Sequence, residues 1–286
     1  MSRVIRQHFV PQFYLRRFTH PANNKIWVFD KESNKTFPTN VTEIASKRGF
    51  YDSLLDDHIA EFESQGVEKL LSRAEGIYAQ LLEELINSVR SGGQIPIELR
   101  KRFAWFLWLQ YTRTDSFRQR LPEFHSENVD RKIAQIWAFQ DAEFIKDFVA
   151  FTENKIWTVG TPKGHREFMT NDNPVLINPL EENLNVIIQN TPNGFSANTK
   201  GIDLLLSLSP RYVLVLSDPE YSPHLISLDG QIRSFADGEM DQFNIVLVGQ
   251  AKRHIYASRN GYEITTAKII SASLADHFES NKKHIA

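Results

Sequence analysis

The chain has 286 residues, of which 41% are hydrophobic and 24% charged, a composition typical of a folded soluble protein. It contains no cysteine, which excludes disulfides, iron–sulfur clusters and thiol nucleophiles and fits a reducing compartment. The formal net charge of -2 gives no overall electrostatic attraction to nucleic acids. The N-terminus lacks the apolar segment of a secretory signal, and the most apolar window, 103–109, is too short to span a bilayer. We therefore expect a cytoplasmic protein without a membrane segment.

The first region, residues 1–52, is predicted to hold a short helix and a β-hairpin. Pro11 favours the first turn of a helix that runs to Phe18. The run Ile26–Asp30 is typical of a strand, and a polar connection leads from it to a second strand at Thr36–Phe37.

Residues 53–151 have a helical pattern. Apolar residues over 67–85 recur at steps of three and four, which predicts one long amphipathic helix that ends at a Gly-Gly pair. A second helix is predicted to run from there towards Leu121, and a third covers about 127–151. We expect these helices to form a compact block.

Residues 152–286 carry short β-rich runs separated by Gly, Pro, Asn and Asp, whereas 241–250 also fits a helix. Strands, then helices, then strands predict an α+β fold. We expect a single domain, 1–286, in which a mixed or antiparallel β scaffold is built from the N- and C-terminal regions and the helical block is inserted between them. The predicted C-terminal strands are 156–159, 167–170, 186–188, 212–216 and 255–258.

The opening stretch offers the first candidate for a functional site. His8 lies just outside the N-terminus of the predicted helix, and Gln12 lies in its first turn. A helix N-terminus carries partial positive charge, which favours a neutral imidazole and attracts anions. His8 is either a general base or ligand contact beside Gln12, or a histidine that caps and packs at the start of the helix. The sequence leaves both interpretations open.

The most apolar predicted helix carries Gln110 and Arg113 on its buried face. A buried guanidinium is costly without an anionic partner, so Arg113 must meet a carboxylate or an anionic ligand. Glu75 or Glu68 on the preceding helix would supply the carboxylate if the two helices pack antiparallel. Arg113 is thus either a structural ion-pair partner or a cation for a phosphate or carboxylate group.

A polar turn follows the predicted strand that ends at Thr170. Side chains such as those of Asn171, Asp172 and Asn173 commonly bond to the backbone of their own turn, which makes an Asx-turn one interpretation. The alternative places Asp172 at the end of a strand as a metal-binding or general-base carboxylate.

Together these segments resemble a bacterial and archaeal family known as domain of unknown function 4238. The resemblance rests on the run from His8 to Phe18, on 26–31, on 110–114 and on 170–175, where Asn171 replaces the usual serine. The family name carries no established activity. The resemblance implies that six polar residues belong to the recurring pattern, namely His8, Gln12, Gln110, Arg113, Asp172 and Asn173.

Such a set would suit hydrolysis of a phosphate-containing substrate, a nucleotide or a nucleic acid. Asp172 would bind a divalent metal or activate water, His8 would transfer a proton, and Arg113 would stabilise negative charge. The alternative is a non-catalytic sensor of a small anionic ligand, or a protein-interaction module, in a bacterial stress or defence context. A basic N-terminus leaves nucleic-acid binding open, and no oligomeric state is predicted. Gln12, Gln110 and Asn173 would contact the substrate.

Overall fold

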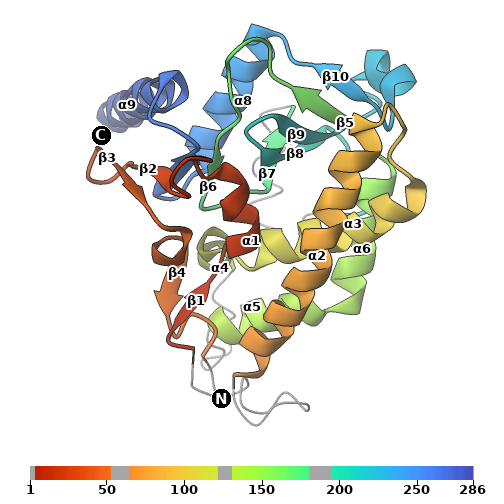
Figure 1. Ribbon diagram of the computed structural model, residues 1–286, viewed down its shortest axis with the longest axis horizontal. Helices are drawn as coiled ribbons and strands as arrows, with labels where there is room; N and C mark the ends of the chain where they lie inside the picture. Colours follow the sequence, from red (N-terminus) through yellow and green to blue (C-terminus); the bar gives the residue numbers. More distant parts are fainter. Residues whose placement is uncertain (1–3, 53–64, 122–130, 181–194, 286) are drawn as a thin grey trace.

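A computed structural model describes residues 4–52, 65–121, 131–180 and 195–285 of the chain. The helices of the middle region lie together on one side, and the strands of the N- and C-terminal regions lie on the other side and above them (Figure 1). The helices are α1 (Gln12–Leu15), α2 (Gly66–Arg90), α3 (Ile97–Thr112), α4 (Asp115–Arg120), α5 (Arg131–Gln140), α6 (Ala142–Glu153), α8 (Asp237–Gln250) and α9 (Tyr262–Ile285). The strands are β1 (Arg6–His8), β2 (Ile26–Asp30), β3 (Lys35–Thr39), β4 (Ser46–Arg48), β5 (Ile156–Thr161), β6 (Thr170–Asn171), β7 (Leu176–Pro179), β8 (Ile202–Ser209), β9 (Tyr212–Ser217), β10 (Ile232–Ser234) and β11 (His254–Ala257).

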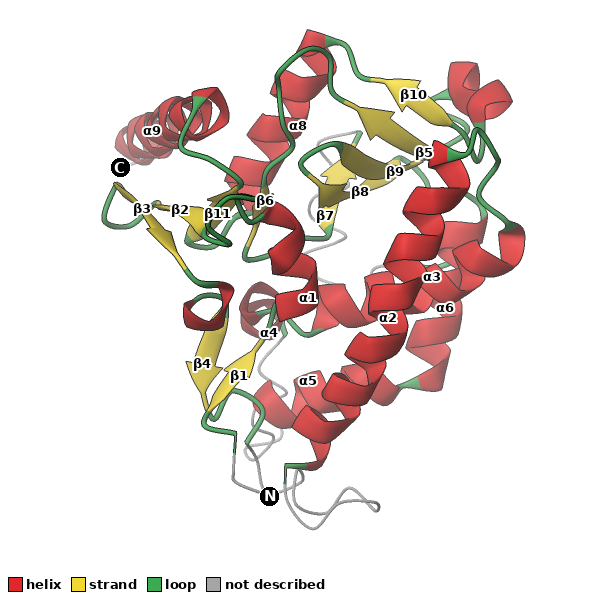
Figure 2. Cartoon of the chain, viewed as in Figure 1, coloured by secondary structure: helices red, strands yellow, loops and turns green. Residues whose placement is uncertain are grey.

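The described strands form three sheets (Figure 2). A two-stranded sheet pairs β1 with β4, and a four-stranded sheet has the order β3-β2-β11-β6, with every pair antiparallel. A five-stranded sheet has the order β10-β5-β9-β8-β7, in which β10 and β5 are parallel and the other pairs are antiparallel. This arrangement confirms the predicted α+β class with mixed sheets and a helical block.

Helix α3 is the buried centre of the helical block. Its contacts show that it runs antiparallel to α2, because residues later in α3 contact residues earlier in α2. The rings of Tyr78 and Phe106 lie 5.1 Å apart, and Glu75 contacts Arg113 further along. The block meets the five-stranded sheet where Phe103 of α3 packs against Trp157 of β5, with ring centroids 6.4 Å apart. The larger hydrophobic core lies between these two layers.

Two of the predicted helices are interrupted at residues that cap a new helix. The helix predicted to run to Leu121 ends at Thr112, and Thr114 caps α4 by accepting a hydrogen bond from the backbone N–H of Phe117. The helix predicted over about 127–151 divides at Asp141, whose side chain accepts two backbone N–H groups of α6. Both predictions were wrong because an N-cap side chain satisfies the free N–H groups of a new helix within an otherwise apolar run.

The prediction of a β-rich C-terminal region was also only partly right. The ambiguous run 241–250 belongs to helix α8, and a further helix, α9, covers Tyr262–Ile285. The strand predicted at 167–170 is reduced to Thr170–Asn171, and the one predicted at 186–188 lies outside the described residues. Helix α9 packs on the second core through the buried Ile264 and Ala267 and the partly buried Ile270 and Leu274. These residues recur at steps of three and four, a helical pattern that the prediction of a β-rich region overlooked.

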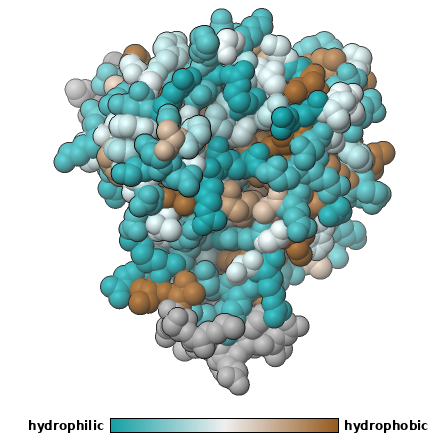
Figure 3. Space-filling model, in the orientation of Figure 1, coloured by the Kyte–Doolittle hydropathy of each residue, from teal (hydrophilic) through white to brown (hydrophobic). Residues whose placement is uncertain are grey.

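The surface is predominantly polar on the face drawn in Figure 3, where hydrophobic groups occur in small separate patches. None of the described helices combines the length and the apolar character needed to cross a bilayer.

Gly160 of β5 occupies a place that has no room for a side chain. A Cβ added there would lie 2.3 Å from the ring of Phe235. We expect Gly160→Ala to lower the free energy of unfolding by about 1–3 kcal/mol through overpacking. Gly76→Ala is the matched control, since nothing lies within 4 Å of its Cβ position on α2, and it should stabilise by about 0.5–1 kcal/mol. Urea denaturation of both variants measures the difference, and equal effects would contradict the packing argument.

Candidate functional site

Arg113 lies at the C-terminal end of α3 and is almost completely buried, with 2% of its surface exposed. Its Nη2 donates to Glu75 Oε1 at 2.9 Å and to the backbone carbonyl of His8 at 2.7 Å. Its Nε donates to the hydroxyl of Tyr51 at 3.4 Å. Burial opposes the charge, but Tyr51 and Glu75 raise the pKa of Arg113 above its usual value. The guanidinium therefore stays charged, and of the two carboxylates that the sequence offered, Glu75 is its partner.

His8 ends β1 beside α1, and its ring contacts Gln12. Gln12 Oε1 accepts a hydrogen bond from Arg16 at 2.9 Å, which turns its Nε2 towards His8 Nδ1 at 3.4 Å. Because that amide can only donate, Nδ1 accepts and the proton of the neutral ring belongs on Nε2. His8 Nε2 is buried and makes no hydrogen bond within the described part of the chain.

The charge state of His8 follows from its surroundings. Burial lowers the pKa of the imidazole, and the Val41 carbonyl and Glu75 offset part of that shift. Arg113 and Arg6 lower the pKa further. The ring is therefore neutral at physiological pH and presents an N–H donor.

Gln110 lies on α3 between Phe106 and Arg113, on the face that packs against α1 and α2. Phe106 identifies this face, because its ring contacts Phe13 of α1 and Tyr78 of α2. The Gln110 side chain is 1% exposed, and neither its Oε1 nor its Nε2 has a hydrogen-bond partner among the described residues. Buried amides are nearly always paired with protein or with ordered water, so the partner of this amide lies outside the described side chains.

Asp172 directly follows β6 and is held by the backbone of the turn before β11. Its Oδ1 accepts the N–H of Lys252 at 2.8 Å, and its Oδ2 accepts those of Arg253 at 2.8 Å and His254 at 2.9 Å. Burial raises the pKa of Asp172, while the three N–H groups oppose that shift. The Asx-turn bond that the sequence suggested belongs to Asn171, whose Oδ1 accepts from Asn173 N at 2.8 Å.

The six predicted residues thus lie in two neighbouring groups. Contacts link His8 to Gln12 and Arg113 to His8 and Glu75, and Gln110 lies one turn before Arg113 on α3; we call these five residues the Gln110 cluster. Asp172 and Asn173 lie beyond Thr114, whose hydroxyl contacts Asn173 Oδ1 at 3.3 Å.

Asp172 lines a separate cleft of about 500 Å³, which none of the other five predicted residues lines. The sequence gave no indication of the other groups at this end of the cleft, because their positions follow no spacing rule. Lys47 of β4 and Lys252 both contact Oδ2 of Asp115, and Lys47 does so at 2.8 Å.

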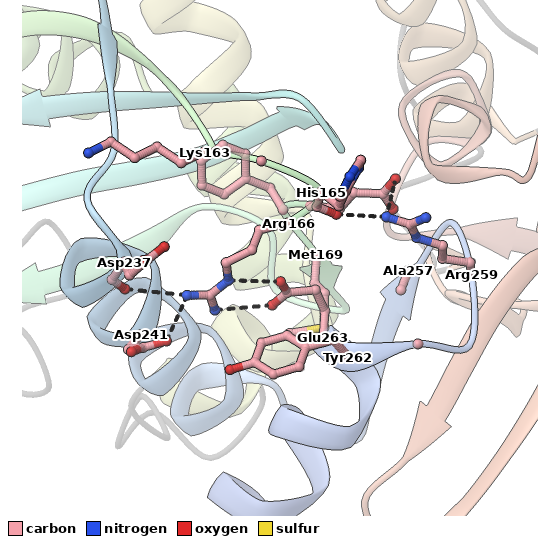
Figure 4. A pocket seen from close by; sticks show the side chains of 14 residues that line it. Lys163, His165, Arg166, Met169, Asp237, Asp241, Ala257, Arg259, Tyr262 and Glu263 are labelled. Carbon is pink, nitrogen blue, oxygen red and sulfur yellow. Dashed lines mark hydrogen bonds and ion pairs between the residues drawn. The ribbon is translucent and has the colours of Figure 1, made fainter.

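A cavity of about 730 Å³ lies between the segment 163–169 and the starts of α8 and α9. In Figure 4 Arg166 points into its centre and is surrounded by acidic groups. Arg166 Nε pairs with Glu263 at 3.1 Å, and its Nη1 pairs with Asp241 at 2.9 Å. The central charge of this cavity is therefore already paired, as that of Arg113 is by Glu75. We prefer the Gln110 cluster as the candidate site because it also contains an amide without a partner among the described residues.

A divalent metal was left open by the sequence. No group of three or more His, Asp or Glu side chains within residues 4–52, 65–121, 131–180 and 195–285 is placed to hold a metal ion. Asp172, the expected ligand, has all of its described hydrogen bonds with backbone N–H groups.

A comparison of two buried glutamines tests whether Gln110 has a partner in the free protein. Gln135 of α5 is fully paired: it donates to the carbonyls of Thr112 and Thr114 at 2.7 and 2.9 Å and accepts from Arg118 at 2.6 Å. We expect Gln135→Leu to lower the free energy of unfolding by about 2–4 kcal/mol, and Gln110→Leu to be neutral or stabilising by about 1 kcal/mol. Chemical denaturation measures both. A loss at Gln110 as large as that at Gln135 would show that the amide is satisfied.

The family model for proteins of unknown function DUF4238 matches residues 6–261 of the chain. The match includes both groups of predicted residues and stops just before α9. No curated protein and no solved structure matches the chain. The chain belongs to the DUF4238 family.

Proposed function

We propose that this protein binds a small anionic ligand at the Gln110 cluster, as a ligand-responsive module. The observation that carries the proposal is the buried side chain of Gln110, whose amide nitrogen and oxygen both lack a partner. Each unpaired buried polar group costs about 1–3 kcal/mol of stability. A ligand that supplies the missing hydrogen bonds would recover that free energy on binding.

The hydrogen-bond donors of the cluster favour an anion. Gln110 presents the two hydrogens of its amide nitrogen, which are suited to acceptor oxygens, and the N–H of the neutral His8 ring faces the Val41 carbonyl. Arg113 adds a positive charge. Its ion-pair partner Glu75 is 27% exposed, so a ligand anion could take the place of that carboxylate while Glu75 turns towards solvent. Phosphate and carboxylate oxygens are the acceptors that such a set of donors recognises best.

Hydrolysis of a phosphate ester is the second candidate, and the neutral state of His8 favours it. An imidazole that donates from Nε2 next to Arg113 can stabilise negative charge that develops on a substrate oxygen. In such a reaction the role of general base would fall to Glu75, which contacts Arg113 at 2.9 Å, rather than to Asp172 in the neighbouring cleft. Nucleotides and nucleic acids remain the proposed substrates of this second function.

A ligand screen with matched variants tests the binding function. Wild type and Gln110→Leu are compared by thermal shift and calorimetry with inorganic phosphate, nucleoside monophosphates and small dicarboxylates. We expect one of these anions to stabilise wild type, by about 2.7 kcal/mol at a hundred times its dissociation constant. Gln110→Leu should lose about tenfold or more in affinity for it, since a hydrogen bond to a charged group contributes about 1.5–3 kcal/mol.

Gln94→Leu serves as the control, because Gln94 is exposed in the connection between α2 and α3. Equal affinities of wild type and Gln110→Leu would reject the Gln110 cluster as the site. Phosphate release from nucleotides and model phosphomonoesters, measured for wild type and Glu75→Gln, separates the two functions. Turnover that Glu75→Gln abolishes supports hydrolysis, and binding without turnover supports the ligand-responsive module.

A further inference from the structure

The cleft beside Asp172 brings two lysines from distant parts of the chain onto one carboxylate. Lys47 comes from β4, Lys252 comes from the turn between α8 and β11, and both ammonium groups contact Asp115 Oδ2. Their side chains are 51% and 32% exposed, so both also reach the solvent of the cleft. Asp115 itself is 7% exposed, at the floor.

Two ammonium groups share one side-chain ion-pair partner at this end of the cleft. At this end the ammonium groups of Lys47 and Lys252 share the single carboxylate of Asp115, and Asp172 is the other carboxylate that lines it. Lys31 meets no carboxylate in the described hydrogen bonds, because its Nζ donates to the carbonyls of Val248 and Ala251. The negative charge of Asp172 is already engaged by three backbone N–H groups.

The surroundings lower the pKa values of both lysines. Burial lowers the pKa of Lys252 and the neighbouring charge of Lys47 lowers it further, whereas Glu32 acts in the opposite direction. Burial also lowers the pKa of Lys47, with a further contribution from Arg118, against which Asp172 acts in the opposite direction. A second anion placed between the two ammonium groups would relieve this repulsion.

The other lining charges of the cleft are paired among themselves. Arg253 contacts Asp30 at 2.8 Å and Glu32 at 3.1 Å, and Arg6 lies 3.6 Å from Glu43. These pairs leave the Lys47–Lys252 end as the part of the cleft where two ammonium groups share one carboxylate in their ion pairs.

We propose that this cleft is a binding site for phosphate or a phosphomonoester, which Lys47 and Lys252 hold between them above Asp115. The volume of about 500 Å³ accommodates the phosphate with a small organic group attached. The two ammonium groups lie on different elements, so one tetrahedral anion with several acceptor oxygens bridges them. The site is separate from the Gln110 cluster and does not depend on the function proposed for it.

The test is calorimetric titration of the full-length protein with sodium phosphate at constant ionic strength near neutral pH, with glycerol 3-phosphate and glycerol as the organic pair. We expect phosphate and glycerol 3-phosphate to bind and glycerol not to bind. Lys47→Gln and Lys252→Gln should each weaken phosphate binding about tenfold or more. Asp115→Asn should change the affinity in the opposite direction and tighten binding, because it removes the competing carboxylate.

Lys146→Gln is the matched control, since it removes the same charge from α6 at a side chain that is 75% exposed and does not line the cleft. It should bind phosphate as wild type does. Lys47→Arg keeps the charge and retains binding if the site needs a cation, which guards against a loss caused by misfolding. Absence of phosphate binding by wild type at millimolar concentration, or equal affinity in Lys47→Gln, would overturn the proposal. Gln110→Leu leaves this titration unchanged, so the two proposed sites fail independently.

Discussion

The buried charge of Arg113 connects the helical block to the N-terminal segment. Its guanidinium contacts Glu75 of α2, the carbonyl of His8 in β1 and the hydroxyl of Tyr51. Breaking one partner of a buried ion pair leaves an uncompensated charge, which is far more costly than losing a surface pair. The start of the chain is therefore held against α3 by Arg113, which also supplies the positive charge of the Gln110 cluster. Arg113 thus contributes both to the fold and to the proposed function, so a substitution of Arg113 alone cannot separate the two roles.

The long-range plan of the fold could be predicted because it depends on periodicity. The amphipathic stripe of α2 and the strand pattern of β2 and β3 appear directly in the sequence, and the structure confirms both elements. The helix breaks at Thr114 and Asp141 were missed, because capping depends on which backbone groups a short polar side chain reaches in three dimensions. Helix α9 was missed for a different reason: Ile264, Ala267 and Ile270 do recur at helical spacing, but the region was interpreted from its strand-like runs.

The candidate residues divide in the same way. Burial of Arg113 and a possible pairing with Glu75 or Glu68 could be predicted from charge and helix spacing, and the structure contains the pair with Glu75. The orphan amide of Gln110 could not be predicted, because a missing partner is a property of the packed state. Lys47 and Lys252 lie 205 positions apart and meet only because β4 and the α8–β11 turn border the same cleft. Contacts of this kind are set by topology, to which a local pattern is insensitive.

The short passage from β6 to β7 has a mechanical consequence. Within Asp172–Val175 the chain leaves the four-stranded sheet and enters the five-stranded one, and Asp172 is clamped at the start of that passage by three backbone N–H groups. A hinge needs backbone that can rotate without breaking hydrogen bonds. At the first residue of this connection, rotation would break the three hydrogen bonds of Asp172. The two sheets should accordingly move as one rigid body. Any closing motion around a ligand would then have to come from the β1–β4 ribbon, which lines the cleft, or from α2, which carries Glu75 of the Gln110 cluster.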